Sequence, residues 1–515
     1  MNMASDHSRS VLGLAIVVAV LALAVGITGF YLHRQFINDD AYISLRYAYN
    51  LIQGDGLVWN PGERAEGYTN FLHILLISGL GALGLDLVAA ARLVNGTAFA
   101  VMVLMLAAYV LRRQKADGQD SDRLVALIPV TLVVTASPMI SWVYGGLEGP
   151  LLAMVCTGGI LYFLRALERG HYTLPLVISS LFFAGATLTR PDGVLFVAAS
   201  VCVLIVVTKR DGRPILVPIL SFALPLAAVY GSYFLWRYSY YGQLMPLTFY
   251  VKATGFDLYK AAAGLQYIGR FLIAPPYLLA MLVPALLWSV YRRTFDRRMA
   301  YLLSLIVVYL AYIVYIGGDY MYSFRLMLPL MPAAALLLYM AVRPALRVMP
   351  AFNLGVIYVI LFALAGLQYF WPGTGVRPMG SQENIATTVG RYIAGAWPRG
   401  SLVALNTAGA TPYFAPDHRY IDMLGLSDVH IARRRIDSIR VPWQRIPGHY
   451  KGDGQYVLSR EPDYIIVGPG AGTTIDDPWF LGDHEMRDDP RFHEHYEGVR
   501  VQLDNCVFTY YERRR

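Results

Sequence analysis

Two shortages in this 515-residue sequence exclude whole classes of protein. Only 15% of the residues are charged, whereas about a quarter are charged in soluble domains, so the composition excludes an ordinary water-soluble protein. The three cysteines, Cys156, Cys202 and Cys506, are too few and too scattered to build a disulfide framework. Two of them lie inside apolar stretches, where we expect them to be packing residues.

Motifs that bind metals or phosphates are also missing. The sequence has no CxxC pair, no HExxH motif and no cluster of metal ligands. Gly468, Gly470 and Gly472 follow a stretch with strand character, but neither a P-loop lysine nor a following helix supports a phosphate-binding loop there. The sequence also lacks internal repeats and low-complexity tracts. We therefore expect a protein that requires no metal and no cofactor.

Long apolar runs, in contrast, fill roughly the first 370 residues. The chain is 56% hydrophobic, and its mean hydropathy is +0.45. The first run, residues 11–32, is too long for a signal peptide and ends without a small-residue cleavage site, so we expect a retained membrane anchor. With the later runs of spanning length, it predicts a polytopic α-helical membrane protein with about 11 transmembrane helices. The later runs lie near residues 91–111, 124–143, 150–167, 174–189, 194–208, 215–236, 272–291, 299–316, 326–342 and 352–371.

Basic residues in the loops between these runs predict the orientation of the chain. Clusters of lysine and arginine mark cytoplasmic loops. They place the N-terminus, with Arg9, in the cytoplasm and everything after about residue 372 outside. The formal net charge of +8 then follows from topology, and no nucleic-acid partner is expected. The clusters are Arg112, Arg113, Lys115 and Arg123; Arg165 and Arg169; Lys209, Arg210 and Arg213; Arg292, Arg293, Arg297 and Arg298; and Arg343 and Arg347.

Successive loops can alternate between the two sides of the membrane, with the basic loops in the cytoplasm, only if the moderately apolar run at residues 70–85 does not cross it. This run is short for a crossing and contains Gly79, Gly81 and Gly84. We therefore assign it to the first external loop, residues 33–90, as a re-entrant or interfacial helix.

Beyond Pro372 the composition changes to that of a soluble domain. Charged residues become frequent, proline and glycine punctuate the sequence, and no spanning run remains. We expect strands at residues 401–405, 464–467 and 499–503 and a helix at 384–393. The sequence thus predicts a membrane domain over residues 1–372 and an extracytoplasmic α/β domain over residues 373–515.

Acidic side chains gather on the outer side of this topology. Asp39 and Asp40 lie shortly beyond the first span, where a carboxylate could take a proton from an incoming hydroxyl while the second reactant stays in lipid. Carboxylates at a membrane edge are costly unless they are paired or ligated, so several on one face indicate a shared polar cavity. The alternative is that each is an ordinary helix cap or turn residue. The other outer acids are Glu66, Glu148, Asp192 and Asp319.

Three blocks in the first external loop resemble one family closely. They read DDAYISLRYA at 39–48, GDGLVWNPGER at 54–64 and EGYTNFL at 66–72. These blocks are similar to GT-C membrane glycosyltransferases related to the terminal arabinofuranosyltransferase of the actinobacterial cell wall and to pilin arabinosyltransferases. Shorter matches lie at residues 146–148, 190–193, 318–319 with Arg325, 422–428 and 448–453.

The resemblance implies the GT-C fold, a helical membrane bundle with a catalytic first external loop and an outer C-terminal domain. It implies a donor sugar carried on polyprenyl phosphate, with arabinofuranose as the favoured sugar. The acceptor would be a hydroxyl of a wall polysaccharide or of a protein-linked glycan. Such donors are used outside the cytoplasm, which agrees with the topology inferred from charge. We expect a multi-pass protein of the bacterial plasma (inner) membrane with a periplasmic C-terminal domain.

The same resemblance gives roles to the charged residues. Asp39 or Asp40 would be the general base, and a single base opposite the leaving group would give inversion. The resemblance favours Asp39, and the second carboxylate would orient the sugar or share a proton. The leaving phosphate requires cations, for which the candidates are Arg325, Lys252 and Arg190. The alternative for each cation is snorkelling from a helix end.

Contacts to the sugar and the acceptor are expected from polar and aromatic residues on the outer side. Tyr68 and Asn70 offer hydrogen-bonding groups, and Trp59 offers a ring for stacking, although tyrosine and tryptophan also populate membrane interfaces for purely physical reasons. Turn capping is the competing account for the loop acids, and a structural loop role is equally open for the outer-domain residues. The full set is Glu66, Tyr68, Asn70, Trp59, Glu148, Asp192, Asp319, His449 and Lys451.

Two other functions remain open. A mannosyltransferase or other glycosyltransferase would keep the fold and the polyprenyl-phosphate donor but change the sugar. A non-catalytic lipid or glycan transporter is disfavoured, because transporters place charges at the bilayer midplane, whereas these acids collect at one edge. Asp39, Asp40 and a further acid could hold a divalent cation, but their spacing does not demand one.

Overall fold

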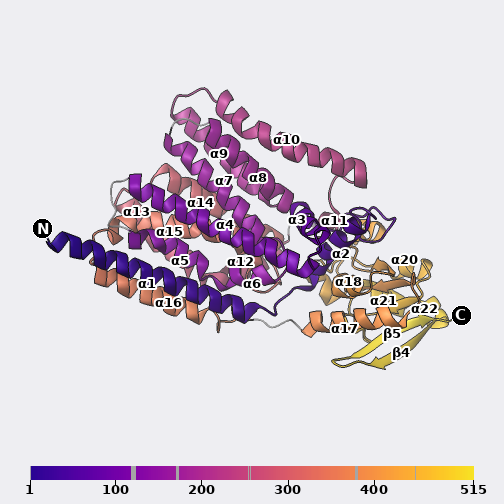
Figure 1. Ribbon diagram of the computed structural model, residues 1–515. Helices are drawn as coiled ribbons and strands as arrows, with labels where there is room; N and C mark the ends of the chain where they lie inside the picture. Colours follow the sequence, from indigo (N-terminus) through magenta and orange to yellow (C-terminus); the bar gives the residue numbers. More distant parts are fainter. Residues whose placement is uncertain are drawn as a thin grey trace.

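The computed structural model describes residues 2–116, 123–169, 173–252, 255, 257–376, 381–446 and 448–514. A bundle of long helices forms the larger part, and a smaller domain with a β-sheet lies at one end of it (Figure 1). The N-terminus of the chain lies at the far end of the bundle from the sheet, and the C-terminus lies beside the sheet (Figure 1).

Seven helical segments of the described chain are long and apolar enough to cross a membrane. An eighth crossing results if α5 (Arg123–Val134) and α6 (Ser137–Tyr144), which meet at an angle of 44°, act as one broken span. The protein is therefore a multi-pass membrane protein. The seven are α1 (Asn2–His33), α4 (Leu87–Ala116), α7 (Gly149–Arg169), α9 (Gly193–Arg210), α10 (Leu216–Tyr241), α14 (Arg297–Ile316), and η2 (Arg325–Leu330) continued by α15 (Met331–Leu346).

Three expected crossings coincide with apolar helices that are shorter than a full span. These are α8 (Thr173–Thr189), α13 (Leu278–Tyr291) and α16 (Ala351–Leu367). The run expected at 272–291 is interrupted, because α12 (Leu258–Leu272) ends before two consecutive prolines at 275 and 276, which cannot continue a helix. Length and composition thus support seven or eight crossings, and the expected total of about 11 stays a prediction.

The segment predicted to be the first external loop folds into α2 (Asp39–Gln53) and α3 (Phe71–Ala82). The side chain of Asn38 accepts a hydrogen bond from the backbone N–H of Asp40 and so caps α2. Gly54 ends α2 with a φ of 91°, a conformation that glycine adopts without strain. α2 packs against α3 and α4 on the bundle side and against α18 (Ala410–Phe414) of the C-terminal domain. The loop is thus buried between the two parts of the protein.

The C-terminal domain contains a five-stranded sheet in the order β2-β1-β3-β5-β4. β1 (Leu402–Leu405) runs parallel to β2 (Arg419–Asp422) and β3 (Tyr464–Ile466), while β5 (Val507–Arg513) runs antiparallel to β3 and to β4 (Tyr496–Gln502). The predicted α/β domain is confirmed. The expected strands correspond to β1, β3 and β4, and the expected helix corresponds to α17 (Ser381–Ala396). The short helices of this domain also include α19 (Val429–Arg433), η3 (Pro442–Arg445), α20 (Gly454–Ser459), α21 (Leu481–Arg487) and α22 (Pro490–His495). One further short helix, α11 (Leu247–Lys252), lies earlier in the chain, between α10 and α12.

Alternating residues of β1 pack into two different hydrophobic cores, because successive side chains of a strand point to opposite faces of the sheet. Val403 and Leu405 belong to the large core that includes Val389 of α17 and extends into the bundle. Ala404 belongs to a separate core with Ile465 of β3 on the other face of the sheet. The sheet domain is therefore packed onto the helical part rather than tethered to it.

Arg46 of α2 holds the first loop to the C-terminal domain. Its guanidinium donates to the backbone carbonyls of Pro412, His418 and Trp59, the last at 2.7 Å from Nε. Each hydrogen bond from a buried charged donor is stronger than a neutral one. This arrangement explains why an arginine can be fully buried at this position without a carboxylate partner among these contacts.

Candidate active site

Asp39 lies at the first turn of α2 and touches the C-terminal domain. Its Oδ1 accepts a hydrogen bond from the backbone N–H of Ala410 at 2.9 Å, and a Cβ added to Gly409 would lie 2.3 Å from its Oδ2. Burial raises the pKa of Asp39 to about 7; the Ala410 hydrogen bond opposes this shift, and the charges of Asp40 and Glu383 add to it. A carboxylate with such a pKa is suited to proton transfer near neutral pH.

Asp40 lies close enough to the basic and phenolic groups of the site to affect their ionisation. It is the largest cause of the raised pKa of Tyr320, and it is the strongest charge acting on Lys252. Asp40 makes no side-chain hydrogen bond to any residue that the structure describes. Its carboxylate therefore remains available to a ligand.

Lys252, at the end of α11, is a cation without an ion-pair partner in the described part of the chain. Burial lowers the pKa of Lys252, Asp40 opposes that change, and Arg325 adds to it. Its Cε lies 3.6 Å from where a Cβ on Gly448 would be, so α11 and the 448–453 motif meet at this side chain. The side chain is exposed, so its amine can contact a ligand.

Arg190 is neutralised by two carboxylates. Its Nη1 lies 2.8 Å from Oε1 of Glu148, and its Nε lies 2.9 Å from Oδ1 of Asp192. Burial raises the pKa of Glu148, but Arg190 and then Arg325 outweigh burial and leave that pKa lowered. Asn70 donates to the other oxygen of Glu148 at 3.1 Å. Among the residues described, Arg190 thus joins three predicted site residues into one network.

Arg325 forms a second ion pair nearby. Its Nη2 lies 2.8 Å from Oδ2 of Asp319, and its guanidinium stands 5.8 Å from the ring of Trp142. Because Asp319 already balances this charge, Arg325 has less free positive charge to offer a ligand than Lys252 has. The structure therefore brings Asp39, Asp40, Lys252, Tyr320 and the two arginine networks into one electrostatically coupled region.

Three first-loop residues that were predicted to bind sugar are engaged in internal contacts. Glu66 is buried and forms an ion pair with Arg237, with 2.7 Å between Oε2 and Nη2. The hydroxyl of Tyr68 lies 3.2 Å from that of Tyr241. Trp59 is almost fully buried, and its carbonyl accepts from Arg46. Nothing in these contacts tests their proposed roles toward sugar, which stay predictions.

The outer-domain residues divide between two environments. The ring of His449 lies 5.9 Å from that of Tyr320 and is stacked on Phe480 at 5.5 Å, which places it on the border of the coupled region. Lys451 is buried and donates to the backbone carbonyl of Arg434. Its amine is thus used in holding a loop, and its role toward substrate remains an untested prediction.

Removing one partner of the buried Glu66–Arg237 pair is expected to destabilise the protein strongly. Glu66→Ala leaves an uncompensated charge in a buried position, which costs about 3–5 kcal/mol of unfolding free energy. Melting of the purified protein in detergent micelles measures the effect. The double variant Glu66→Gln with Arg237→Gln removes both charges and is the matched control. A double variant as unstable as the single one would show that charge pairing is not the cause.

Several groups at the site were not predicted from the sequence. Gly409 and Ala410 supply the backbone against which Asp39 rests, Glu383 acts on its pKa, and Tyr320 lies in the field of Asp40. Across the described residues, no group of three or more His, Cys, Asp or Glu side chains is arranged to hold a metal ion. The question of a divalent cation is left to experiment.

The sequence is similar to two curated terminal β-(1→2)-arabinofuranosyltransferases. The one from Corynebacterium glutamicum is 28% identical over 362 residues, which are 63% of this chain and 50% of that protein. The one from Mycobacterium tuberculosis is 28% identical over 248 residues, which are 46% of this chain and 38% of that protein. The chain therefore spans half, or less, of the length of these relatives. A family model described as a domain of unknown function (DUF8728) matches residues 376–512, the C-terminal domain.

The arrangement of helices and sheet domain matches solved membrane enzymes. ArnT from Cupriavidus metallidurans, bound to undecaprenyl phosphate, matches with a TM-score of 0.54 and 13% identity over 79% of this chain and 85% of that one. The apo oligosaccharyltransferase of Archaeoglobus fulgidus matches with a TM-score of 0.55 and 13% identity, over 95% and 73%. Identity this low establishes the fold alone. The chain has the GT-C fold that its first-loop motifs predicted.

Proposed function

We propose that this protein is a glycosyltransferase that transfers arabinofuranose from a polyprenyl-phosphate donor to a hydroxyl of a wall polysaccharide or protein-linked glycan. The observation that carries the proposal is the pair Asp39 and Asp40 near Lys252, a cation with no ion pair to any described residue, at the junction of the helical bundle and the C-terminal domain. The names of the two arabinofuranosyltransferase relatives support the sugar. The undecaprenyl phosphate bound to ArnT supports the class of donor.

In the proposed reaction, Asp39 is the general base. It takes the proton of the acceptor hydroxyl as that oxygen attacks the anomeric carbon, and the bond from this carbon to the phosphate oxygen breaks. The electron pair of that bond leaves on polyprenyl phosphate, where Lys252 offsets the developing negative charge. Attack from the side opposite the phosphate inverts the anomeric centre. Asp40, whose carboxylate makes no internal hydrogen bond within the described chain, orients the donor sugar.

Transfer by the full chain in proteoliposomes, with a synthetic farnesyl-phosphoryl arabinofuranose, tests this function. Linkage analysis should find a new arabinofuranosyl unit of inverted configuration on an oligosaccharide acceptor. Transfer only from the matching mannose donor would identify a mannosyltransferase of the same fold. Glycan assembly that persists in the double variant Asp39→Asn with Asp40→Asn would instead favour a transporter. Activity that survives chelation would exclude a required divalent cation.

The proposed orientation places the C-terminal domain and the Asp39 pair in the periplasm. A chain that carries Cys156→Ala, Cys202→Ala and Cys506→Ser is the background for adding single cysteines. In right-side-out spheroplasts, Arg500→Cys on exposed β4 should react with a membrane-impermeant maleimide. Lys209→Cys at the cytoplasmic end of α9 should react only after permeabilisation. The reverse pattern would place the site on the cytoplasmic side and contradict the proposed use of an outer-leaflet donor.

A further inference from the structure

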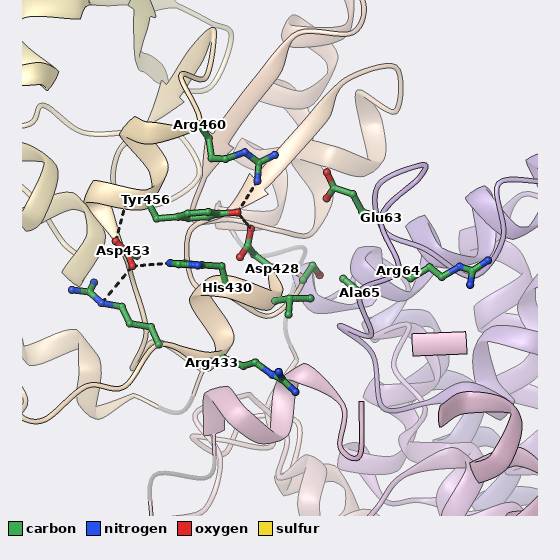
Figure 2. Close-up of a pocket in the computed structure, with 12 residues that line it drawn as sticks. Glu63, Arg64, Ala65, Asp428, His430, Arg433, Asp453, Tyr456 and Arg460 are labelled. Atoms are coloured by element: carbon green, nitrogen blue, oxygen red, sulfur yellow. Dashed lines mark hydrogen bonds and ion pairs between the residues drawn. The ribbon is translucent and has the colours of Figure 1, made fainter. Parts of the chain in front are cut away.

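A polar pocket lies outside the region of Asp39 and Lys252. It has a volume of about 820 Å³ and opens between first-loop residues 63–65 and the C-terminal domain (Figure 2). This volume falls within the range of about 300–1,000 Å³ that is common for small-molecule sites. The proposed transfer reaction uses none of its lining residues, although Asp428 and Asp453 belong to the motifs at 422–428 and 448–453.

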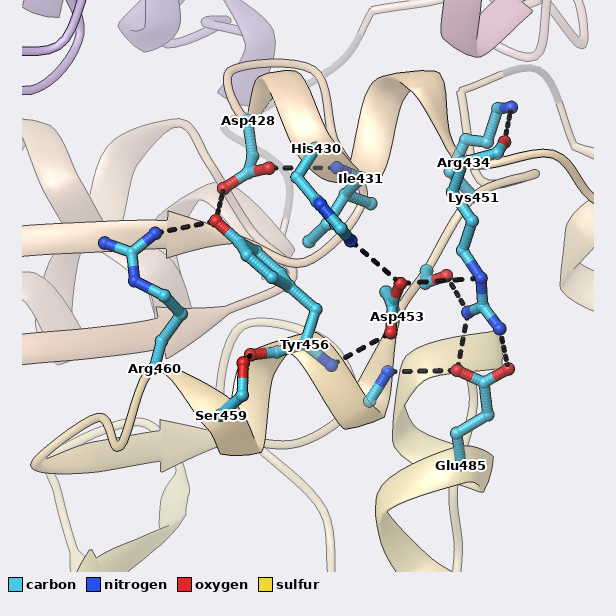
Figure 3. Close-up of polar contacts among 12 residues, drawn as sticks. Asp428, His430, Ile431, Arg434, Lys451, Asp453, Tyr456, Ser459, Arg460 and Glu485 are labelled. Atoms are coloured by element: carbon cyan, nitrogen blue, oxygen red, sulfur yellow. Dashed lines mark hydrogen bonds and ion pairs between the residues drawn. The ribbon is translucent and has the colours of Figure 1, made fainter.

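A fixed pair of aromatic rings forms one wall of the pocket. His430 of α19 is stacked on Tyr456 of α20, with ring centroids 4.0 Å apart and planes 13° from parallel. The Tyr456 hydroxyl lies 3.3 Å from Oδ2 of Asp428 and accepts from Arg460 at 2.6 Å, while Nε2 of His430 lies 3.2 Å from Oδ2 of Asp453 (Figure 3). Both rings are therefore held before any ligand arrives. The side chain of His430 is still 54% exposed, so its outer face is open to stacking.

Arginines reach the pocket from both parts of the protein. Arg64 comes from the first loop, and Arg433 and Arg460 come from the C-terminal domain (Figure 2). Arg64 rests on the ring of Tyr240 at 4.6 Å, and Arg433 lies 5.4 Å from the ring of Tyr250. Arg433 also donates to the side chain of Gln243, and packing of this kind positions a guanidinium while leaving its other edge donors available.

The charges of the pocket nearly balance, which favours a neutral ligand over an anion. A fourth arginine of the lining, Arg434, is already paired with Glu485 at 2.6 Å. Glu63 is likewise paired, with Arg419 at 2.8 Å. Setting both pairs aside leaves three arginines with two carboxylates, those of Asp428 and Asp453. Planar donors and acceptors beside an aromatic face are suited to the neighbouring hydroxyls and the apolar face of a sugar ring.

The pocket shares its floor with the helix that carries Lys252. A small apolar cluster joins Ala65 of the first loop, Leu247 and Val251 of α11, and Ala432 of α19. The side chain of Val251 is fully buried in this cluster, and Lys252 follows it directly. The pocket and the proposed transfer site are thus separated by little more than one short helix.

We propose that this pocket binds a neutral sugar segment of the acceptor glycan, at a distance from the hydroxyl that reacts. The proposal rests on the proposed glycosyl transfer and adds a second acceptor subsite to it. A glycan held in this pocket and at Asp39 together contacts the protein at two points. Long acceptors then bind more tightly than short ones, because the second contact is intramolecular.

Transfer kinetics with acceptors of two lengths test the subsite. For a hexaarabinofuranoside, His430→Ala and Arg460→Ala should each raise KM about tenfold with kcat little changed, the loss expected for one good contact. For a single arabinofuranoside, neither variant should change KM or kcat. The matched control is Arg500→Ala, which removes an exposed arginine of β4 outside the pocket. Equal KM values for wild type and His430→Ala with the long acceptor would overturn the proposal.

A direct binding measurement distinguishes failure of the proposed sugar pocket from failure of the proposed transfer reaction. The hexaarabinofuranoside should give saturation-transfer NMR signals with the full chain in micelles without donor, and His430→Ala should raise the apparent Kd obtained from these signals about tenfold. If no donor is transferred but this binding persists, the transfer reaction fails and the sugar pocket stands. If transfer proceeds and binding does not depend on His430, the pocket proposal fails alone. Displacement by inorganic phosphate but not by free arabinofuranosides would show an anion site and also overturn it.

Discussion

Asp39→Asn is expected to lower kcat for glycosyl transfer by about 10²- to 10⁴-fold, the usual contribution of a general base. The amide cannot take the acceptor proton, yet its oxygen can still accept the hydrogen bond from Ala410 that Asp39 accepts at 2.9 Å. The size of the side chain against Gly409 is also unchanged. The fold should therefore be retained, and equal melting temperatures for variant and wild type in micelles check that it is.

The pH profile gives an independent test of the same role. Burial raises the pKa of Asp39 to about 7, and only the deprotonated form is a base. The kcat/KM of the wild type should therefore rise with pH and level off above neutrality, with an acid limb near pH 7. Asp40→Asn removes a charge that contributes to this shift, so the limb should move to lower pH. If Asp40→Asn instead abolished the acid limb and Asp39→Asn retained it, Asp40 would be the general base and Asp39 the supporting residue.

The local chemistry of the first loop was predictable, whereas its partners were not. Adjacent carboxylates after an apolar run are visible in the sequence, and Asn38 before them is a recognisable helix cap. The contact with Ala410 joins residues 371 positions apart, and no periodic pattern reports such a distance. The nearly neutral pKa of Asp39 comes from burial, which the hydrogen bond from Ala410 only partly offsets, so it became visible only in the folded protein.

The surroundings of Glu66 show what residue type alone does not reveal. Its position in a block with tyrosine and asparagine predicted a contact to sugar, which stays a prediction, and the structure adds a buried ion pair with Arg237 of α10. A lone arginine near the end of an otherwise apolar helix was the signal that a buried partner exists. In the same way, the acids that were predicted to lie on the outer side are matched by specific arginines, Arg190 and Arg325, whereas Lys252 has no ion-pair partner among the described residues.

Strands were predicted where the sequence is continuously apolar, as in β1 and β3. β2 begins and ends with a charged residue and was missed, and in the edge strand β4 glycine and charged residues limited the expectation to residues 499–503. β5, which was missed, follows a turn and ends in charged residues, and it is recognised by its pairing with β3 and β4. Prolines at 275 and 276 shortened the span expected at 272–291 to α13, which begins only at Leu278, because the apolar composition of the run hid the break.

Lys252→Gln is expected to lower kcat by about 10²- to 10³-fold, the loss typical for a group that stabilises developing negative charge. Glutamine keeps most of the length of the side chain and can still donate hydrogen bonds. The decrease in kcat therefore measures the contribution of the positive charge. Arg325→Gln should cost less in kcat, because Asp319 already offsets that cation. Lys209→Gln, at the opposite end of the bundle, is the matched control and should leave transfer unchanged. The KM for the donor should change less than kcat, because the charge on the phosphate grows as the bond breaks.

The alkaline limb of the pH profile tests whether the amine of Lys252 is the group that supports kcat. Burial lowers the pKa of Lys252, so the cation should be lost below the pH of about 10.4 at which a free lysine titrates. Activity should then decline on that side, and the wild-type profile should be bell-shaped. Lys252→Arg keeps a charge that does not titrate in this range, so any activity it retains should lack the alkaline limb. An unchanged limb in Lys252→Arg would assign that titration to another group and remove Lys252 from the proposed stabilisation of the leaving phosphate.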